Sequence, residues 1–424
     1  MSQPPPLEPQ TLAPSPEGLS ARLKELALLF LKLGLIGFGG PQAHIALIHD
    51  EAVTRRGWLR EDQFLEGVAI CEMLPGPAST QTGIYTGYLR AGQLGALVAG
   101  LCFIAPAFLI MLVLSWAYFR FQGVPQIDHL FLGISPVVIA IIFGFCYKLG
   151  KKAIKDWQGV AIALVVLLVS LIFRVNILLL FLAAGLAGLA IYRPTAPPPA
   201  GPSGRASAWL APLLPITQGL PNLLANLPVD PLAVTSFWGL DRIQAYVLPL
   251  TTFFLQTGAF IFGGGLVIIP LIETAVVDDF GWMTRSQFID GVALGELTPG
   301  PVVITAAFVG YKVAGALGAL VATVAIFTPS FLFIMFASPW LLRLRQSPWV
   351  KSFLRGVLPA ALGAIAAAAI PLAAAAMLQP TVPRTVVAVT VGLAALVALV
   401  RFHRPAWQLV LAGAGVGLLA GALV

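Results

Sequence analysis

Two glutamates and two Pro-Gly-Pro units are the residues of this sequence whose types and spacing could do chemistry. Glu72 stands three residues before Pro75-Gly76-Pro77, and Glu296 stands three residues before Pro299-Gly300-Pro301. Each unit interrupts a long apolar stretch, where a carboxylate is costly and is for that reason a functional candidate. Such a group could exchange a proton, or oppose an anion so that it can leave. The alternative is that each glutamate is tied at a helix end to a neighbouring arginine or to backbone N–H groups.

The Pro-Gly-Pro units and an earlier glycine-rich segment predict breaks in helices. A helix can stop at Phe38-Gly39-Gly40 and restart at Pro41, because proline fits the first helical position. A helix that starts at Pro77 would direct free backbone N–H groups, its positive dipole end and side-chain donors to one point. A tetrahedral oxyanion needs several donors and little counter-charge, so these breaks favour an anion. The alternative is that the glycines and prolines only permit close packing and kinks.

The same device recurs in the second half of the chain with less polar side chains, so we expect the first half to contact an anion more. His44 is a titrating or hydrogen-bonding candidate in one half only, because Ile268 stands at the equivalent position. The predicted binding residues are Phe38, Gly39, Gly40, Pro41, Gln42, His44, Pro75, Gly76, Pro77, Ser79, Thr80, Gln81, Gly263, Gly264, Gly265, Pro299, Gly300, Pro301 and Thr305. Glu72 and Glu296 are the coupling candidates.

The composition indicates that the elements carrying these residues lie in lipid. Of 424 residues, 58% are hydrophobic and 10% are charged, where a soluble domain carries roughly 25% charged residues. A soluble fold is thereby excluded. Cys71, Cys102 and Cys146 stand singly in apolar surroundings, which excludes a disulfide framework. The net charge of +7 comes from basic residues that stand between apolar blocks. This placement indicates how the chain is oriented in a membrane, and it does not indicate a nucleic-acid partner.

Continuous apolar blocks predict an all-α, polytopic integral membrane protein. They lack the alternating polarity of barrel strands. Blocks long enough to cross a bilayer fall at about 26–48, 93–119, 130–147, 157–173, 175–192, 243–272, 313–342, 356–383, 385–400 and 405–424. We predict a disordered tail at residues 1–23, not a cleaved signal, a first repeat at 24–192, a proline-rich linker at 193–240 and a second repeat at 241–424.

The two repeats are visible as motifs that recur at one spacing. Gly57-Trp58 answers Gly281-Trp282 at a spacing of 224, and after a single deletion Gly87-Tyr88 answers Gly310-Tyr311 at a spacing of 223. Glu72 and the first Pro-Gly-Pro unit keep the spacing of 224. An internal duplication accounts for this run.

The basic residues indicate how the two repeats insert. Lys148, Lys151, Lys152 and Lys155 form the basic cluster of the first repeat, and Arg343, Arg345, Lys351 and Arg355 form that of the second. The second cluster is displaced by one helix, so the repeats have inverted topology if both clusters face the cytoplasm. The segment at Pro75-Gly76-Pro77 is either a re-entrant hairpin or a broken spanning helix. The prolines of the linker favour the hairpin.

Enzyme motifs are not visible in this sequence. It holds no P-loop, no paired-cysteine metal spacing, no His-Glu-x-x-His and no nucleophile elbow. We therefore predict no catalytic residue, no metal site and no cofactor, and a membrane-embedded enzyme is a remote alternative.

These motifs together resemble the chromate ion transporter family in its long two-domain form. The resemblance rests on Phe38-Gly39-Gly40-Pro41 with His44, Gly57-Trp58, Leu74-Pro75-Gly76-Pro77 with Gln81, Tyr85 and Gly87, and on Phe262-Gly263-Gly264-Gly265, Gly281-Trp282, Pro299-Gly300-Pro301 and Gly310-Tyr311. It covers the chain from about residue 24 to the end, outside the long linker.

The resemblance implies a multi-pass carrier of the bacterial inner membrane that exports chromate and confers chromate resistance. Its partners would be a chromate-like oxyanion and the lipid bilayer, and the sequence is compatible with a homodimer. Transport of sulfate or a related oxyanion is the alternative, because sulfate and chromate share charge and shape and helix N-termini would not separate them well.

Overall fold

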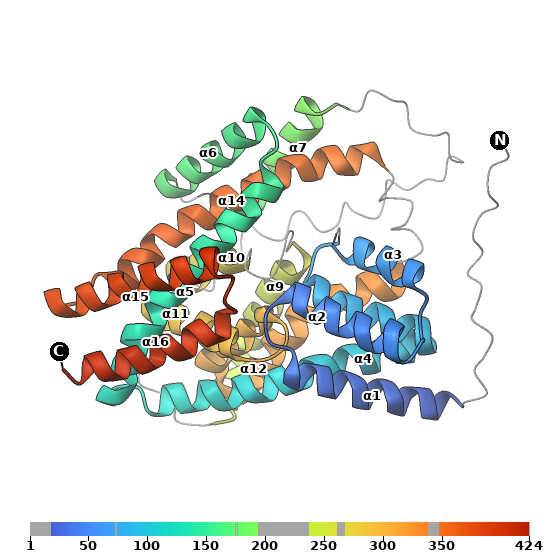
Figure 1. Cartoon of the computed structure of the whole chain (residues 1–424), viewed down its shortest axis with the longest axis horizontal. Helices are drawn as coiled ribbons and strands as arrows, with labels where there is room; N and C mark the ends of the chain where they lie inside the picture. Colours follow the sequence, from blue (N-terminus) through green and yellow to red (C-terminus); the bar gives the residue numbers. More distant parts are fainter. Residues whose placement is uncertain are drawn as a thin grey trace.

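The computed structural model describes residues 18–72, 74–173, 175, 177–193, 237–260, 268–337 and 347–423 (Figure 1). Most of the predicted tail and linker lies outside these residues. Within them every regular element is helical, because a chain in lipid must satisfy its backbone groups internally. The elements are α1 (Leu19–Ile36), α2 (Pro41–His49), η1 (Asp50–Arg55), α3 (Glu61–Cys71), α4 (Ala78–Arg120), α5 (Pro125–Ala153), α6 (Trp157–Ile172), α7 (Ile177–Ile191), α9 (Ile243–Ala259), α10 (Ile268–Glu273), η4 (Thr274–Asp279), α11 (Arg285–Leu297), η5 (Val302–Ile304), α12 (Thr305–Leu332), η6 (Phe333–Ala337), α14 (Pro348–Met377), α15 (Val382–Arg401) and α16 (Ala406–Gly421).

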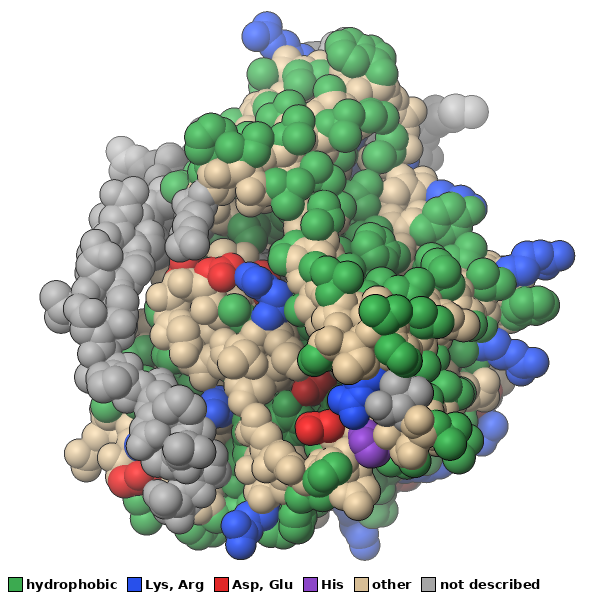
Figure 2. Space-filling model, turned by 90° about the vertical axis from the view of Figure 1, so that its left-hand side faces the viewer, with side chains coloured by type: hydrophobic (Ala, Val, Ile, Leu, Met, Phe, Trp, Pro, Cys, Tyr) green, Lys and Arg blue, Asp and Glu red, His purple; other side chains and the backbone are tan. Residues whose placement is uncertain are grey.

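Long apolar helices confirm the prediction of an all-α polytopic membrane protein. Five helical segments of the described chain are long and apolar enough to cross a bilayer: α4, α5, Val302–Phe336, α14 and α15. Large hydrophobic side chains such as Leu101, Leu109 and Val386 are exposed on the outside of the molecule. Figure 2 shows how hydrophobic side chains cover much of one face. Such a surface is stable against lipid and not against water.

The internal duplication is visible in the backbone. The α4 helix is broken at Ala91 and Gly92, and α12 is broken at the equivalent Ala314 and Gly315. The two glycines have nearly the same positive φ, +63° and +61°, which a residue with a side chain rarely adopts. The π-helix η1 likewise has its equivalent in η4. In the described chain the α-helices of the two halves also correspond in order: α1, α2, α3, α4, α5, α6 and α7 answer α9, α10, α11, α12, α14, α15 and α16.

An ion pair recurs at equivalent positions of the two halves, with acid and base exchanged. His49 Nε2 lies 2.8 Å from Glu61 Oε2 in the first half. At the positions 224 residues later, Glu273 Oε1 lies 2.7 Å from Arg285 Nε. In both halves the pair joins the helix after the break to the first turn of the next helix, although acid and base have exchanged places.

Two helical hairpins carry the Pro-Gly-Pro units at their tips. Gly67 of α3 lies directly against the ring of Tyr85 in α4, and Gly76 is the midpoint between them in sequence. In the second half Gly291 of α11 lies against the ring of Phe308 in α12, around a tip at Gly300. The two helices of each pair are therefore antiparallel. This is the arrangement of the predicted hairpin and not that of a straight helix with a break.

The halves interlock through α5 and α14, which are equivalent helices. The α5 helix packs on α15 and α16 of the second half, with Gly133 in close backbone contact with Gly413. Reciprocally, α14 packs on α6 and α7, where Gly356 meets Gly188. Figure 1 shows α5 and α14 side by side near the centre of the molecule.

The α5 and α14 helices run antiparallel. Gly150, near the end of α5, approaches Leu362 of α14, whereas Leu132, near the start of α5, and Ala376, near the end of α14, line the same cavity. Antiparallel equivalent helices are what inverted repeats require. Opposite insertion in the membrane stays a prediction that this arrangement supports.

Candidate functional site

The first predicted helix break separates α1 from α2. The α1 helix ends at Ile36, Gly39 and Gly40 have φ values of +108° and +83°, and Pro41 is the first residue of α2. Proline is suited to that place because its φ is already helical and its missing N–H would be unpaired there. The break exposes the carbonyl of Gly37 to other elements.

The tip of the second hairpin meets this first break. Gly300 N–H donates a hydrogen bond to the Gly37 carbonyl oxygen at 2.8 Å. His44 Nε2 donates to the same oxygen at 2.8 Å, and its ring is buried edge-on against Phe103 of α4. A Cβ on Gly300 would lie 3.0 Å from the Cβ of Ala107 in α4. The break, the long helix of the first half and the tip of the second half thus form one junction.

The tip of the first hairpin makes the matching contact with the second half. Gly76, at φ +126°, lies against Ser330 of α12, which is equivalent to Ala107 at the spacing of 223. Gln81 Nε2 donates to the Pro75 carbonyl at 2.6 Å and to Ser330 Oγ at 3.4 Å. Each hairpin tip therefore contacts the long helix of the other half.

The polar side chains at the two tips differ. Ser79, Thr80 and Gln81 at the start of α4 are buried. Thr80 Oγ1 and Gln81 Oε1 have no hydrogen-bond partner among the described residues. In the second half Thr305 Oγ1 is already bonded to the Val302 carbonyl at 3.1 Å. Because buried polar atoms are nearly always paired, the orphaned atoms of the first half indicate a place where a polar ligand could bind.

Glu72 and Glu296 occupy unlike environments although they are equivalent in sequence. Glu72 is exposed; Gln42 Nε2 donates to its carboxylate at 3.2 Å, and Lys152 Nζ lies 3.7 Å away. Glu296 has one buried carboxylate oxygen with no partner in the described part of the chain. The exposed Glu72 thus has the pairing expected of a structural carboxylate, and Glu296 has the environment expected of a functional one.

The remaining predicted residues are arranged as follows. Phe38 is exposed and packs against the ring of Trp407 at the start of α16, with ring centroids 5.8 Å apart. Gly263, Gly264 and Gly265 lie outside the described residues. Among the charged groups of the first half, Lys32 Nζ of α1 lies 2.7 Å from Glu51 Oε1 of η1. This contact, with Arg56, holds the pKa of Glu51 below its usual range.

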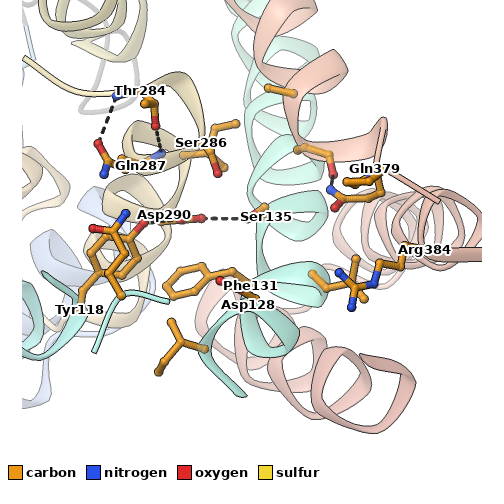
Figure 3. Close-up of a pocket in the computed structure, with 17 residues that line it drawn as sticks. Tyr118, Asp128, Phe131, Ser135, Thr284, Ser286, Gln287, Asp290, Gln379 and Arg384 are labelled. Atoms are coloured by element: carbon orange, nitrogen blue, oxygen red, sulfur yellow. Dashed lines mark hydrogen bonds between the residues drawn. The ribbon is translucent and has the colours of Figure 1, made fainter. Parts of the chain in front are cut away.

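One buried carboxylate was missed by the sequence reasoning. Asp290 of α11 accepts hydrogen bonds from Tyr118 Oη at 2.7 Å and from Ser135 Oγ at 3.0 Å, at the wall of a cavity (Figure 3). The signal was present, since Asp290 is a lone acid between Ile289 and the apolar run that leads to Glu296. No group of three or more His, Cys, Asp or Glu side chains in the described ranges is arranged to hold a metal ion.

Two interlocked repeats, helices broken within apolar sequence and an unpaired buried hydroxyl at the start of α4 are features of a polytopic membrane protein of the transporter class. The chain belongs to the chromate transporter family, whose profile matches residues 24–189 and 248–418. It is 36% identical to the chromate transport protein of Cupriavidus metallidurans over 94% of this chain and 93% of that protein. It is 37% identical to the probable chromate transport protein of Synechococcus elongatus over 82% and 84% of the two chains.

A shorter relative corresponds to a single repeat. The uncharacterized transporter YwrA of Bacillus subtilis is 33% identical over 166 residues, which cover 93% of YwrA and 38% of this chain. A protein of half length is what an internal duplication implies. No solved structure matches this chain. Family membership and the long apolar helices together establish a multi-pass membrane protein.

Proposed function

We propose that this chain is a secondary transporter that exports chromate across the bacterial inner membrane and thereby confers chromate resistance. The names of the relatives support the substrate class. The observation that carries the proposal is the junction at Gly37, where the tip of one half is hydrogen-bonded to the broken helix of the other. The buried start of α4 adds an unpaired hydroxyl on Thr80, which can donate to an anion.

This arrangement suits a tetrahedral oxyanion. Backbone N–H groups at helix starts and neutral side-chain donors can surround the oxygens of the anion, and they avoid the large desolvation cost of a buried lysine or arginine. We assign the predicted residues at the first break and at both tips to substrate binding. Glu296, with its buried carboxylate oxygen, would oppose the anion and keep its binding reversible.

The hairpin contacts supply a way to alternate access. Because Gly76 rests on α12 and Gly300 rests on α4, a movement of one half against the other shifts both tips at once.

The membrane potential favours export. A dianion that leaves a cell that is negative inside gains about 4.6 kcal/mol per 100 mV, twice the value for one charge. Uptake of the same ion would need coupled cations. The membrane potential therefore supports export as the direction of chromate transport.

The test is labelled chromate accumulation in inverted membrane vesicles that contain the full chain, with a potential imposed. We expect uptake that exceeds uptake by vesicles without the chain. Absence of uptake would refute the proposal, and equal competition by excess sulfate would replace chromate with a general oxyanion as substrate.

A matched pair of variants tests the site. Thr80→Val removes an unpaired buried hydroxyl at the tip, whereas Thr86→Val removes a buried hydroxyl of the same helix that is bonded to the Thr82 carbonyl at 2.8 Å. We expect a higher KM for chromate in Thr80→Val alone. The same KM in both variants would place the anion elsewhere.

A further inference from the structure

Asp290 joins three elements from both halves of the molecule. It belongs to α11 of the second half, and its two carboxylate oxygens accept hydrogen bonds from Tyr118 at the end of α4 and from Ser135 in α5. Only 5% of its surface is exposed. Figure 3 shows the carboxylate between the two hydroxyl groups. The protonation state of the Asp290 carboxyl group thus affects how α11 is attached to the first half.

The groups that face Asp290 leave its charge without a bonded cation in the described chain. Its two hydrogen-bond partners in the described chain are neutral hydroxyls. Asp128 of α5 and Arg384 of α15 line the same cavity, and neither is hydrogen-bonded to Asp290. On its own helix, Arg285 is bonded to Glu273 and Asp278.

The other helices packed against α11 add no bonded charge. Lys312 of α12 lies over the ring of Phe119, with Nζ 5.3 Å from the centroid. The α16 helix has no ionisable residue, and the basic residues of α14, Lys351 and Arg355, lie in its first turns, far along the helix from Ala376 beside the cavity. An ionised carboxylate buried in this way is expensive, and the uptake of a proton removes that cost.

A cavity of about 310 Å³ leads to Asp290. Its polar lining includes Gln122 from the α4–α5 turn, Ser286 and Gln287 from the start of α11, and Gln379 from the α14–α15 turn. Figure 2 shows the face to which these turns belong, with acidic, basic and histidine side chains gathered among hydrophobic ones. A polar cavity of this size admits water, and water can carry a proton to the carboxylate.

The cavity lies at the end of α5 that is remote from the basic cluster. Lys148, Lys151 and Lys152 occupy the last turns of α5, and Asp156 just beyond them is bonded to Arg355 of the second basic cluster at 2.8 Å. The described residues of both clusters are therefore at the same end of the molecule. The positive-inside rule assigns that end to the cytoplasm, so the cavity opens to the outer side.

We propose that Asp290 is a proton-binding site of the transporter, loaded through this cavity from the outer side of the membrane, which couples proton entry to anion export. The proposal rests on the proposed function and names the coupling ion. The proton forms an O–H bond with one carboxylate oxygen at the outer side and leaves that oxygen again on the cytoplasmic side. Proton entry and dianion exit both carry positive charge inward, so the two gradients add.

The link from Asp290 to the anion site is α11 itself. Glu296 lies six residues further along the helix, about 9 Å, and the tip that bonds to Gly37 follows directly. When Asp290 gains a proton, one oxygen becomes a donor, so the Tyr118 or Ser135 hydroxyl that faces it must turn its own hydrogen away and accept, and two bonds to a charged acceptor become weaker bonds to a neutral one. The attachment of α11 to α4 and α5 weakens, and the hairpin with its tip can shift.

The test uses inverted vesicles with the full chain, in which the lumen corresponds to the outer side. With the potential clamped, chromate uptake and luminal pH are followed with an acidic lumen and with a neutral lumen. We expect an acidic lumen to raise wild-type uptake several-fold and chromate uptake to release luminal protons. Asp290→Asn should keep potential-driven uptake and lose both effects.

The matched control is Glu66→Gln, which removes the exposed carboxylate at the equivalent position of the first repeat and should behave as wild type. Tyr118→Phe and Ser135→Ala remove donors that favour the ionised form, so the midpoint of the pH dependence should move to higher pH in both. These two variants decide the matter if Asp290→Asn fails to insert.

Three results overturn the inference in distinguishable ways. No wild-type chromate uptake under a potential refutes the proposed function. Wild-type uptake without proton release leaves the function standing and refutes proton coupling. Proton coupling that persists in Asp290→Asn, or an unchanged pH midpoint in both hydroxyl variants, refutes the assignment of the proton to Asp290.

Discussion

The substitution Gly300→Ala tests the junction between the two halves. Gly300 has φ +101°, its N–H donates to the Gly37 carbonyl at 2.8 Å, and an added Cβ would lie 3.0 Å from the Cβ of Ala107. The methyl group therefore strains the backbone and crowds α4 at the same point. Either response moves the tip away from the first break.

The expected loss can be worked from these contacts. A side chain in the left-handed region costs roughly 1–2 kcal/mol. Loss of the hydrogen bond to Gly37 adds about 1 kcal/mol. Together, about 2–3 kcal/mol corresponds to a roughly 30- to 150-fold smaller population of the closed junction, at 1.4 kcal/mol for each factor of ten. We expect the initial rate of chromate uptake to fall by at least about tenfold on the same scale.

Gly281→Ala is the control for the backbone strain alone. Gly281 has φ +61°, and nothing lies within 4 Å of a Cβ added there. It should lower thermal stability by roughly 1–2 kcal/mol and leave the uptake rate of the inserted protein near that of wild type. Uptake by Gly300→Ala at the rate of Gly281→Ala, with both proteins inserted equally, would show that the junction has no part in transport.

Two further predictions concern charged groups. A hydrogen bond from the Tyr192 hydroxyl, with the nearby Arg355, holds the pKa of Asp156 below its usual range. The ionised Asp156 therefore stabilises the fold at pH values above its pKa in the unfolded chain, and this stabilisation is lost as the pH falls through its pKa in the folded chain. Asp156→Asn should therefore lower the free energy of unfolding at neutral pH by about 1 kcal/mol or less, and its melting temperature should fall less steeply than that of wild type as the pH is lowered. A decline as steep as in wild type would contradict this. Glu296→Gln should tighten chromate binding and slow its release, whereas Glu72→Gln, at an exposed carboxylate, should change neither; equal kinetics of the two variants would contradict the asymmetry.

Local breaks could be predicted because their causes are local. Pro41 begins a helix directly after Gly39-Gly40, and Gly76 and Gly300 adopt φ values that only glycine adopts easily. The duplication doubled this information, because each motif could be checked against its equivalent. The break at Gly39-Gly40 and the two Pro-Gly-Pro tips were therefore identified correctly as places where helices stop and restart. The break predicted at Gly263-Gly264-Gly265 lies outside the described residues, and the role of all these residues in binding stays a prediction.

Contacts between the halves could not be predicted from the same information. The bond from Gly300 to Gly37 and the bond from Tyr118 to Asp290 join segments that are distant in sequence, and no periodicity reports which elements pack together. The repeat even misleads here, since Glu72 and Glu296 are equivalent in sequence and unlike in exposure. What differs is the partner: Gln42 and Lys152 reach the first carboxylate, and no described side chain bonds the buried oxygen of the second.

Inverted insertion yields a prediction that equivalent positions lie on opposite sides of the membrane. Lys155 follows α5, and Leu378, which is 223 residues later, follows α14. Because α5 and α14 are antiparallel, Lys155 is at the end of the molecule with the basic clusters, and Leu378 is beside the cavity at the other end. Single cysteines at these two positions, in a chain whose three native cysteines are replaced, should react with an impermeant thiol reagent from opposite sides. Leu378→Cys should react with the reagent in cells whose outer membrane has been removed and whose inner membrane is intact. Lys155→Cys should react only in inverted vesicles. Labelling of both cysteines from one side would refute the inverted topology, and with it the assignment of the cavity to the outer side.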